Sequence, residues 1–368
     1  MKVIVIGAGA AGLSIGWRLV QAGVEVAVIE RGTPGRGASW AAAGMIAAPL
    51  ERAEPDDAES ELVRQSASLW PEFAAEVEDA SGKAVSFAVN GGLVVARTPE
   101  EMESLRARAA RGDGEWLTPD AARLREPRLA PDMTAALWIE KEAKVDNRAL
   151  GPALAAAFTR AGGALLVNET VVRFELGEGR VFGVCTPFAL HHADAYVLAA
   201  GAWTSRIEGL PPAVLPPIIP VKGEMLALEP PSDQSAPGPA IMGSEVYLVA
   251  QRGYLLIGAT VTREGFDTST TRAAADWLAG RAASLIPSLP DWDVAEQWAG
   301  LRPGTPDDLP ILGKSAIDNL FIAGGQFRSG ILYTPAIADA LSALVLGKDS
   351  SFDIRAFDPG RFGESNRQ

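Results

Sequence analysis

Three glycines near the N-terminus have the spacing of a turn that binds phosphate groups. Gly7, Gly9 and Gly12 lie in GAGAAG, between a β-branched run and an apolar helical pattern. The first permits a tight bend, the second lets the backbone approach a pyrophosphate, and the third allows close helix–strand packing. A side chain at Gly9 is also expected to strain the turn. Glu30 ends the next strand pattern, where a carboxylate can bind ribose hydroxyls. A bare glycine-rich turn is the alternative, but this context favours a dinucleotide site, for NAD or FAD.

A run of small residues, RGASWAAAGMI at positions 36–46, follows Glu30 and Arg31. It could be a buried helix start, because alanine favours helices and small side chains pack closely. It could instead leave room for a large flat ligand, since Ser39 and residues 41–44 would let backbone amides approach it. Met45 would then add a flexible apolar contact. The position after Glu30 favours the second interpretation.

The elements that must position these residues begin with a βαβ unit. The patterns predict a buried strand at 2–6, a helix at 10–22 and a strand at 24–29, which implies a parallel sheet. Residues 85–96 predict two strands paired as a hairpin around Asn90-Gly91. Further helices are expected at 58–80, 100–111, 149–161 and 272–286, and further strands at 164–174, 181–184, 195–199, 224–229 and 245–259.

Dinucleotide-type elements occur at 1–50, 145–205 and 295–345, with strand-rich stretches between them. We therefore predict an α/β protein in which a Rossmann-like dinucleotide-binding domain is interleaved with a domain built on a mixed or antiparallel sheet. The first domain is expected to comprise 1–80, 145–205 and 295–368, and the second 81–144 and 206–294.

Composition limits the partners. The chain has 368 residues, 48% of them hydrophobic, and a net charge of −13, which opposes nucleic acid or an anionic membrane as the main partner. The single Cys185 excludes an intrachain disulfide and fits a reducing compartment. No window of 18 apolar residues predicts a membrane helix. The start MKVIVIGAG resembles a signal peptide, but its cleavage would destroy the glycine motif, so we expect a cytoplasmic protein.

With these motifs the sequence resembles the D-amino-acid oxidase and glycine oxidase family of flavoproteins, and within it the glycine oxidases of thiamine biosynthesis. The resemblance begins with GAGAAG, VIER and GASWAAAGM, and recurs at 220–226 (PVKGEML), 298–313 (WAGLRPGTPDDLPILG) and 321–337 (FIAGGQFRSGILYTPAI). It implies a glutathione-reductase-type Rossmann domain with non-covalent FAD. It also implies oxidation of a small amine acid such as glycine, sarcosine, D-alanine or D-proline, with electrons passing to O2 to give H2O2. We further expect a homo-oligomer.

Position by position, the resemblance implies cofactor contacts at Gly7, Gly9, Ala10, Ala11, Gly12, Glu30, Arg31, Ser39, Ala43, Gly44, Met45, Val171, Gly201, Trp203, Gly325, Arg328, Ser329, Gly330, Ile331 and Leu332. It implies substrate contacts at Tyr247, Arg302, Arg328 and Met45. An α-carboxylate is well bound by a bidentate guanidinium with a hydroxyl donor. The alternatives are a structural salt bridge for Arg302, a solvated turn for Arg328 and an ordinary strand aromatic for Tyr247.

The two histidines of the sequence, His191 and His192, are adjacent in a polar connection and are interpreted as surface residues. No Ser-His-Asp set, metal cluster or P-loop appears. The implied chemistry needs no acid or base, because the α-hydrogen of a neutral amine can leave as hydride to the flavin. The protein then positions the carbon and excludes water. Glu245 and Gln326 depart from the family pattern, Gln326 where relatives often have histidine, and leave the substrate's side chain open.

Two other functions stay open. A related dehydrogenase would pass electrons to a quinone, which requires membrane contact, and the acidic sequence shows no basic amphipathic helix for it. A flavin-binding sensor without turnover is the other, and the presence of both arginines with Tyr247 argues against it.

Overall fold

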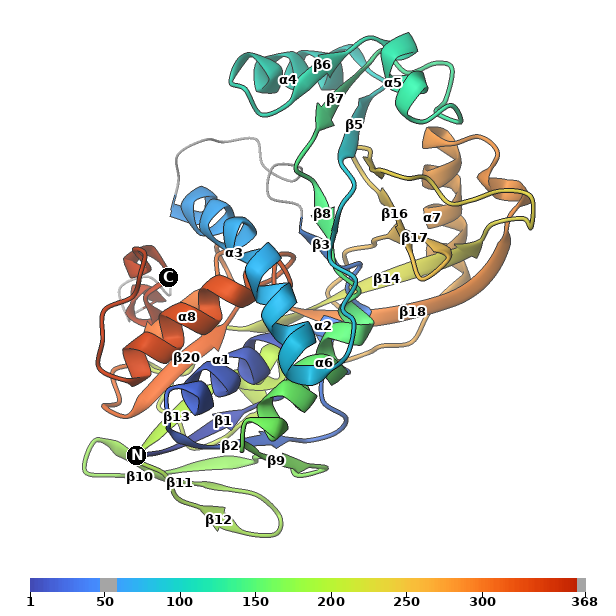
Figure 1. Ribbon diagram of the computed structural model, residues 1–368. Coiled ribbons are helices and arrows are strands. Elements are labelled where there is room, and N and C mark those ends of the chain that lie inside the picture. Colours follow the sequence, from blue (N-terminus) through green and yellow to red (C-terminus); the bar gives the residue numbers. More distant parts are fainter. Residues whose placement is uncertain (47–57, 363–368) are drawn as a thin grey trace.

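The computed structural model of the chain describes residues 1–46 and 58–362, and Figure 1 shows their arrangement. One large sheet has six strands in the order β19-β20-β13-β1-β2-β9. Its strands are β1 (Lys2–Ile6), β2 (Glu25–Glu30), β9 (Ala164–Val167), β13 (Ala195–Leu198), β19 (Ile311–Lys314) and β20 (Leu320–Gly324). Neighbouring strands are parallel except for β19 with β20, so the predicted βαβ unit is confirmed.

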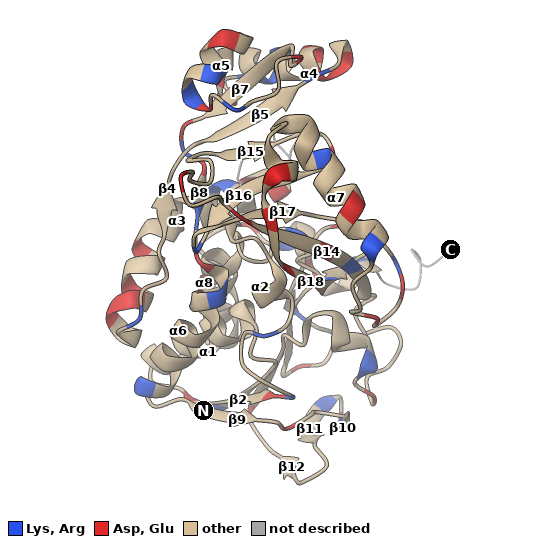
Figure 2. Cartoon of the chain, turned by 90° about the vertical axis from the view of Figure 1, so that its right-hand side faces the viewer, with Lys and Arg blue, Asp and Glu red and all other residues tan. Residues whose placement is uncertain are grey.

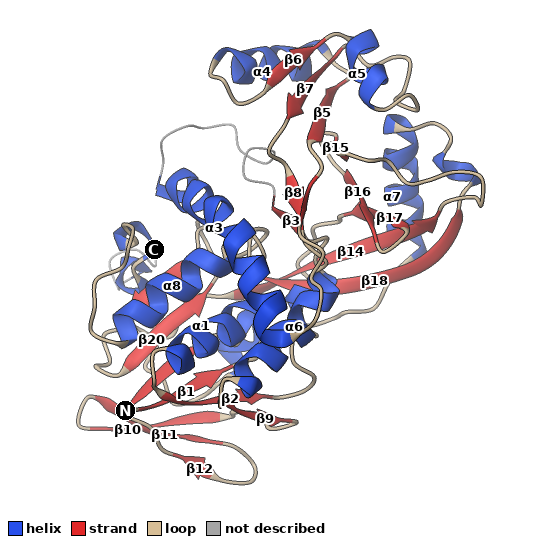
Figure 3. Ribbon diagram, in the orientation of Figure 1, coloured by secondary structure: helices blue, strands red, loops and turns tan. Residues whose placement is uncertain are grey.

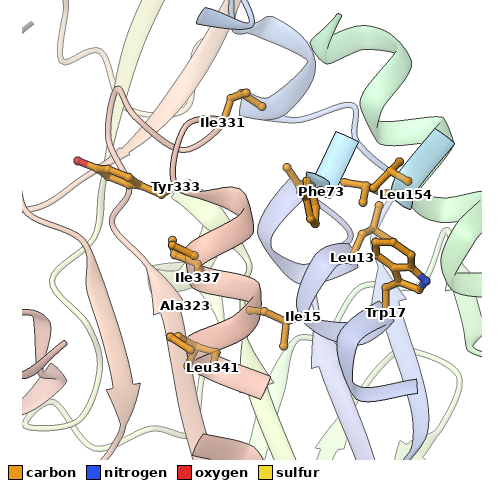
Figure 4. Packing of buried hydrophobic residues seen from close by; sticks show 14 of the residues in the cluster. Leu13, Ile15, Trp17, Phe73, Leu154, Ala323, Ile331, Tyr333, Ile337 and Leu341 are labelled. Carbon is orange, nitrogen blue, oxygen red and sulfur yellow. The ribbon is translucent and has the colours of Figure 1, made fainter. Parts of the chain in front are cut away.

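Helices cover one face of this sheet (Figure 3). They are α1 (Ala10–Gln21), α3 (Ala58–Ser81), α6 (Asn147–Arg160) and α8 (Thr334–Val345). Because side chains alternate along a strand, Val3 and Val5 of β1 pack into the core formed with these helices, while Ile4 and Ile6 pack on the opposite face. Apolar side chains of α1 and α8 meet in the same core (Figure 4). The continuous apolar run of β1 thus reflects burial on both faces.

A small sheet of β10 (Arg173–Gly177), β11 (Arg180–Cys185) and β12 (Leu190–His191) packs on the opposite face. The prediction of one strand over 164–174 is therefore wrong. β9 ends at Val167, and Asn168 has φ 58°, in the left-handed region that a strand cannot contain. The chain leaves the large sheet at this point and begins β10 in the small one.

A second large sheet has eight strands in the order β18-β14-β17-β16-β15-β5-β7-β6. Its strands are β5 (Gly92–Ala96), β6 (Glu115–Leu117), β7 (Ala135–Ile139), β14 (Ile219–Glu229), β15 (Ala240–Met242), β16 (Tyr247–Gln251), β17 (Tyr254–Gly258) and β18 (Asp293–Gly304). Only β15 and β5 pair in parallel within it. β18 follows β14 along its whole length, so residues 295–304 lie in this sheet although the predicted boundary placed them with the other domain. The parallel and mixed sheets confirm the predicted α/β class.

The predicted hairpin around Asn90-Gly91 is wrong. β4 (Ala88–Val89) pairs with β8 (Ala143–Lys144), which also pairs with β3 (Met45–Ile46), whereas β5 pairs with β7 and β15. Gly91 has φ +70°, and a Cβ there would lie 2.1 Å from Cη2 of Trp138. The glycine therefore allows the chain to pass closely under an indole between two sheets, and it does not close a two-residue turn.

The outer helices of the second sheet are α4 (Pro99–Ala110), α5 (Pro119–Arg125) and α7 (Arg272–Leu285). Acidic and basic residues are interspersed along them (Figure 2), a mixture typical of solvated helices. Among the helices of residues 1–46 and 58–362, none combines the length and apolar character needed to cross a bilayer.

Candidate active site

A cavity of about 560 Å3 opens where the parallel strands of the six-stranded sheet end. Its wall includes the segments after β1, β2, β13 and β20, and it continues to β14, β16 and β18 of the second sheet. Open α/β sheets bind ligands at this edge. All residues predicted to contact cofactor or substrate line the cavity except Gly325. Gly325 is packed against the protein instead, because a Cβ there would lie 2.5 Å from Cγ2 of Thr305.

The glycine motif forms the end of the cavity at the N-terminus of α1. Gly7 has φ +104°, and a Cβ there would lie 2.4 Å from the oxygen of Ala199; at Gly12 a Cβ would lie 2.0 Å from the oxygen of Gly7. Gly9 differs, because its φ of −73° suits any residue and its nearest neighbour would be Ser39 Oγ at 3.5 Å. The expected strain at Gly9 is therefore wrong. The protein itself needs Gly7 and Gly12, and only a ligand in the cavity needs Gly9.

Glu30 and Arg31 are held at the end of β2. The two carboxylate oxygens of Glu30 accept hydrogen bonds from the backbone N–H groups of Ala8 (2.8 Å) and Gly32 (2.9 Å). A carboxylate retains lone pairs for hydroxyl donors after two such bonds. The Arg31 guanidinium lies 3.5 Å above the ring of Trp203, and desolvation lowers the pKa of Arg31 while the Glu30 charge opposes that shift. Val171, in the connection between β9 and β10, is buried beside them.

The small-residue run contains a four-residue helix, α2 (Ala38–Ala41), and also lines the cavity. Ser39 Oγ accepts a hydrogen bond from the Ala10 N–H at 3.0 Å, which joins the run to the start of α1. The run packs closely against β18, because a Cβ at Gly300 would lie 2.3 Å from the Cβ of Ala41. Gly44 has φ +77° and its Cβ would lie 2.0 Å from the oxygen of Val145. The run therefore packs closely against Gly300 and Val145 and also lines the cavity, and its contact with a flat ligand stays a prediction.

Side chains that the sequence did not single out fix this run. Asn147 Nδ2, buried at the start of α6, donates to the carbonyl oxygens of Ser39 (2.8 Å) and Trp40 (2.9 Å). Trp298 Nε1 donates to the oxygen of Ala41 at 2.9 Å. The Arg148 guanidinium lies 3.8 Å from the ring centroid of Trp40 and 4.5 Å from that of Trp298. The motif WAGLRPG contains Trp298, but nothing local in the sequence indicates Asn147 or Arg148.

The end of the cavity that contains the predicted substrate contacts is built across strands of the eight-stranded sheet. On β18, Nη1 of Arg302 donates to the carbonyl oxygens of Thr260 (3.0 Å) and Lys222 (3.4 Å). The guanidinium lies flat against Gly223 of β14, where a Cβ would be 2.2 Å from Nη1. On β16, the hydroxyl of Tyr247 donates to Met225 Sδ at 3.4 Å. Gly258 makes room for this ring, since a Cβ there would lie 2.3 Å from it.

Arg328 is exposed at the junction of this cavity and a second one of about 310 Å3, with its guanidinium 5.2 Å from the ring centroid of Phe327. Glu245 lines the second cavity and forms an ion pair with Arg281 at 2.9 Å. Gln326 lines the main cavity and is 8% exposed, and its Nε2 has no hydrogen-bond partner in the part of the chain that the structure describes.

These observations fit FAD. The open space beside Gly9 at a helix N-terminus accommodates a pyrophosphate, Glu30 lies beside it for the ribose, and the small residues 41–44 border the path toward Arg302. Gln326 adds an unused buried donor. The site and fold together define a flavin-dependent oxidoreductase.

The chain belongs to the DAO family of FAD dependent oxidoreductases, whose model matches residues 2–344. The predicted family and the FAD cofactor are thereby confirmed. The chain is 34% identical over 367 residues to the bifunctional protein ThiO/ThiG of Synechocystis sp., a match that covers 98% of this chain and 54% of that protein. It is also 34% identical over 368 residues to glycine oxidase of Geobacillus kaustophilus, covering 96% of this chain and 95% of that one. The crystal structure of the latter superposes with a TM-score of 0.92 at 33% identity, over 98% of this chain and 99% of that one.

The chain spans about half the length of the bifunctional relatives that it matches.

Proposed function

We propose that this chain oxidises the amine of glycine or of a similarly small amine acid, such as sarcosine, D-alanine or D-proline. Electrons pass to O2 to give H2O2. The imine product hydrolyses to an oxo acid and an amine, which is ammonia from glycine or D-alanine and methylamine from sarcosine, whereas the amine of D-proline stays attached in the opened ring. The observation that supports this proposal most is that Arg302 and Tyr247 line the same cavity as the glycine motif. Similarity to glycine oxidases and to ThiO/ThiG proteins supports a role in thiamine biosynthesis.

In this proposal Arg302 binds the substrate carboxylate. The carbonyl oxygens of Thr260 and Lys222 hold its guanidinium in one orientation, and a planar fork held in this way suits a bidentate carboxylate. Tyr247 contributes a hydroxyl from the neighbouring part of the wall, and Arg328 adds positive charge at the mouth. Met45, which also lines the cavity, supplies an apolar contact.

The chain need not supply a proton acceptor for this reaction. No histidine lines the cavity within residues 1–46 and 58–362. FAD bound in this cavity would supply the hydride acceptor for the α-hydrogen of the neutral amine. The protein positions that carbon and keeps water away with a buried apolar cluster beside the cavity, which includes Ala41, Ala43, Met225 and Trp298.

Anaerobic mixing of the FAD-loaded protein with glycine tests this proposal, and the flavin's yellow colour is expected to bleach. Admission of air should restore the colour with uptake of O2 and release of H2O2. Bleaching that is reversed only by a quinone would show the dehydrogenase instead. A flavin that none of the four amine acids bleaches would leave a binding protein without this turnover.

We also propose that the six-stranded sheet with its helices forms the FAD-binding domain and that the eight-stranded sheet forms the substrate domain. The cavity between them, lined from both sheets, supports this division. A homo-oligomer in the cytoplasm remains part of the proposal, and native mass measurement in solution tests the association.

A further inference from the structure

Gln326 is a buried polar side chain that the proposed reaction does not use. It follows β20, lines the main cavity and is 8% exposed. Its Nε2 finds no hydrogen-bond acceptor within the described ranges. Buried amide donors are almost always satisfied, because losing water without gaining a partner is costly. An acceptor on a bound group would remove this cost.

The backbone around Gln326 is held on both sides. The N–H of Phe327 donates to the oxygen of Pro303 at 3.0 Å, which joins the turn to the end of β18 beside Arg302. The N–H of Ser329 donates to the oxygen of Gln326 at 3.0 Å, and that of Tyr333 donates to the oxygen of Ser329 at 2.9 Å. The turn therefore fixes the Gln326 side chain at the end of the cavity where Arg302 lies.

We propose that Gln326 donates a hydrogen bond from Nε2 to the flavin ring of FAD. The pyrimidine part of that ring has carbonyl oxygens and nitrogen lone pairs that accept hydrogen bonds. A substrate carboxylate has acceptors too, but it must enter and leave in every cycle. The side chains proposed to bind it, Arg302, Tyr247 and Arg328, are all partly or fully exposed. A donor as buried as Gln326 suits a resident group, and a neutral amide adds the bond without adding charge.

Gln326→Leu tests the donor, because leucine fills the buried position with an apolar side chain that cannot donate a hydrogen bond. The FAD Kd, measured from flavin fluorescence on dilution of the holoenzyme, should rise roughly tenfold, which is about 1.4 kcal/mol. The absorption spectrum of the bound flavin should also shift, which a purely structural role would not cause. Acetate provides a second probe, since its binding to the holoenzyme reports the carboxylate site.

Asn319→Leu is the matched control. Asn319 is a buried amide whose Nδ2 donates to the oxygens of Val181 (3.0 Å) and Asp194 (3.2 Å), outside the cavity. Its loss should lower the melting temperature and leave the FAD Kd within twofold. Gln326→Leu should do the reverse, because Nε2 of Gln326 has no hydrogen bond to residues 1–46 or 58–362 that could be lost.

Gln326→Glu adds a pH test. A buried carboxyl has a raised pKa; when ionised it only accepts hydrogen bonds, and when protonated it donates again. The FAD Kd of this variant should therefore fall as the pH is lowered from about 8 to about 5, while that of Gln326→Leu should not. The proposal is overturned if Gln326→Leu binds FAD with a Kd within twofold of the parent. If acetate binding to this variant weakens at the same time, the hydrogen bond goes to the substrate carboxylate; if it stays unchanged, Gln326 contacts neither group.

Discussion

At the phosphate end of the cavity the chemistry comes from one short turn, and at the substrate end it comes from four strands. Gly7, Gly9 and Gly12 lie within six consecutive residues, although a Cβ at Gly7 would meet Ala199 and one at Gly9 would face Ser39. Arg302 and Tyr247, by contrast, lie on β18 and β16 with β14 and β17 between those strands, and they line one cavity because the sheet brings all four strands together. One end is thus local in sequence, and the other exists only through the register of a sheet.

Glycines serve different purposes at the two ends. Gly12 prevents a collision within the backbone, whereas Gly9 leaves space for a ligand. Gly223 and Gly258 instead make room for the Arg302 and Tyr247 side chains. The same substitution should therefore damage the fold, the cofactor site or the substrate site, depending on the glycine.

Gly9→Val should have the largest effect on function. A Cβ at this position has its nearest neighbour at 3.5 Å, so the chain should fold, but the side chain would occupy the proposed pyrophosphate space. We expect FAD affinity to fall by at least roughly 100-fold, about 2.7 kcal/mol. Flavin content and circular dichroism of the purified variant measure the two properties separately.

Gly12→Ala provides the contrast. Its Cβ would lie 2.0 Å from the oxygen of Gly7, so this variant should lose roughly 1–3 kcal/mol of stability, the cost of overpacking. A Gly9→Val protein that folds and retains its full flavin content would contradict the proposed position of the cofactor. Equal destabilisation of both variants would remove the distinction between the two glycines.

Arg302→Ala should retain FAD and lose most of its activity on glycine. Removing one side of a buried charge pair costs about 2–5 kcal/mol, or roughly 30-fold to several-thousand-fold in kcat/KM. Arg302→Lys should recover only part, because an ammonium group cannot form the bidentate fork. An amine that lacks a carboxylate should be a poor substrate for the parent protein and equally poor for Arg302→Ala. Glycine kinetics within about threefold of the parent would make Arg302 structural.

Gly223→Ala should act through Arg302. The added Cβ would lie 2.2 Å from Nη1, so the guanidinium must move, and we expect kcat/KM for glycine to fall about tenfold with FAD retained. In the Arg302→Ala background the same change should have little further effect, since coupled residues are not additive. Gly280→Ala in α7, with nothing within 4 Å of its Cβ, is the control and should leave activity unchanged. If the losses in kcat/KM were additive in the double variant, Gly223 would not act through Arg302.

The smallest expected effect is the change in melting temperature when the pH is lowered. Lys222 is the residue whose carbonyl oxygen accepts a hydrogen bond from Arg302. Its Nζ donates to Oδ2 of Asp267 at 2.7 Å and to Oε2 of Glu264 at 3.0 Å. The hydrogen bond from Lys222 lowers the pKa of Asp267 from 3.8 to about 2. A lowered pKa stabilises the folded state above pH 3.8, and this contribution is lost as the pH falls toward 2. The melting temperature should therefore decline over that window, and less steeply in Asp267→Asn; identical declines would show that the Lys222 contact contributes nothing.

From the sequence alone, the βαβ unit, the position of the phosphate-binding turn and most helices could be predicted. Glycine spacing and apolar periodicity involve residues that are close along the chain, so both patterns can be recognised without knowledge of the tertiary structure. Nearly all residues that the family motifs implied as contacts also line the cavity, and the exception is Gly325, which packs against Thr305. The contact that Gly12 avoids, with the Gly7 oxygen, follows from the same local geometry, whereas the contact that Gly7 avoids, with Ala199, does not.

Tertiary structure decided the rest. Asn90-Gly91 has the composition of a hairpin turn, yet Trp138 and the pairing of β4 with β8 direct the chain between two sheets. Arg302 is oriented by the oxygens of Thr260 and Lys222, which are 42 and 80 residues away in sequence. Which strand pairs with which, and in what register, depends on burying whole sheet faces at once. No local pattern contains that information, so the orientation of Arg302 could be known only from the folded chain.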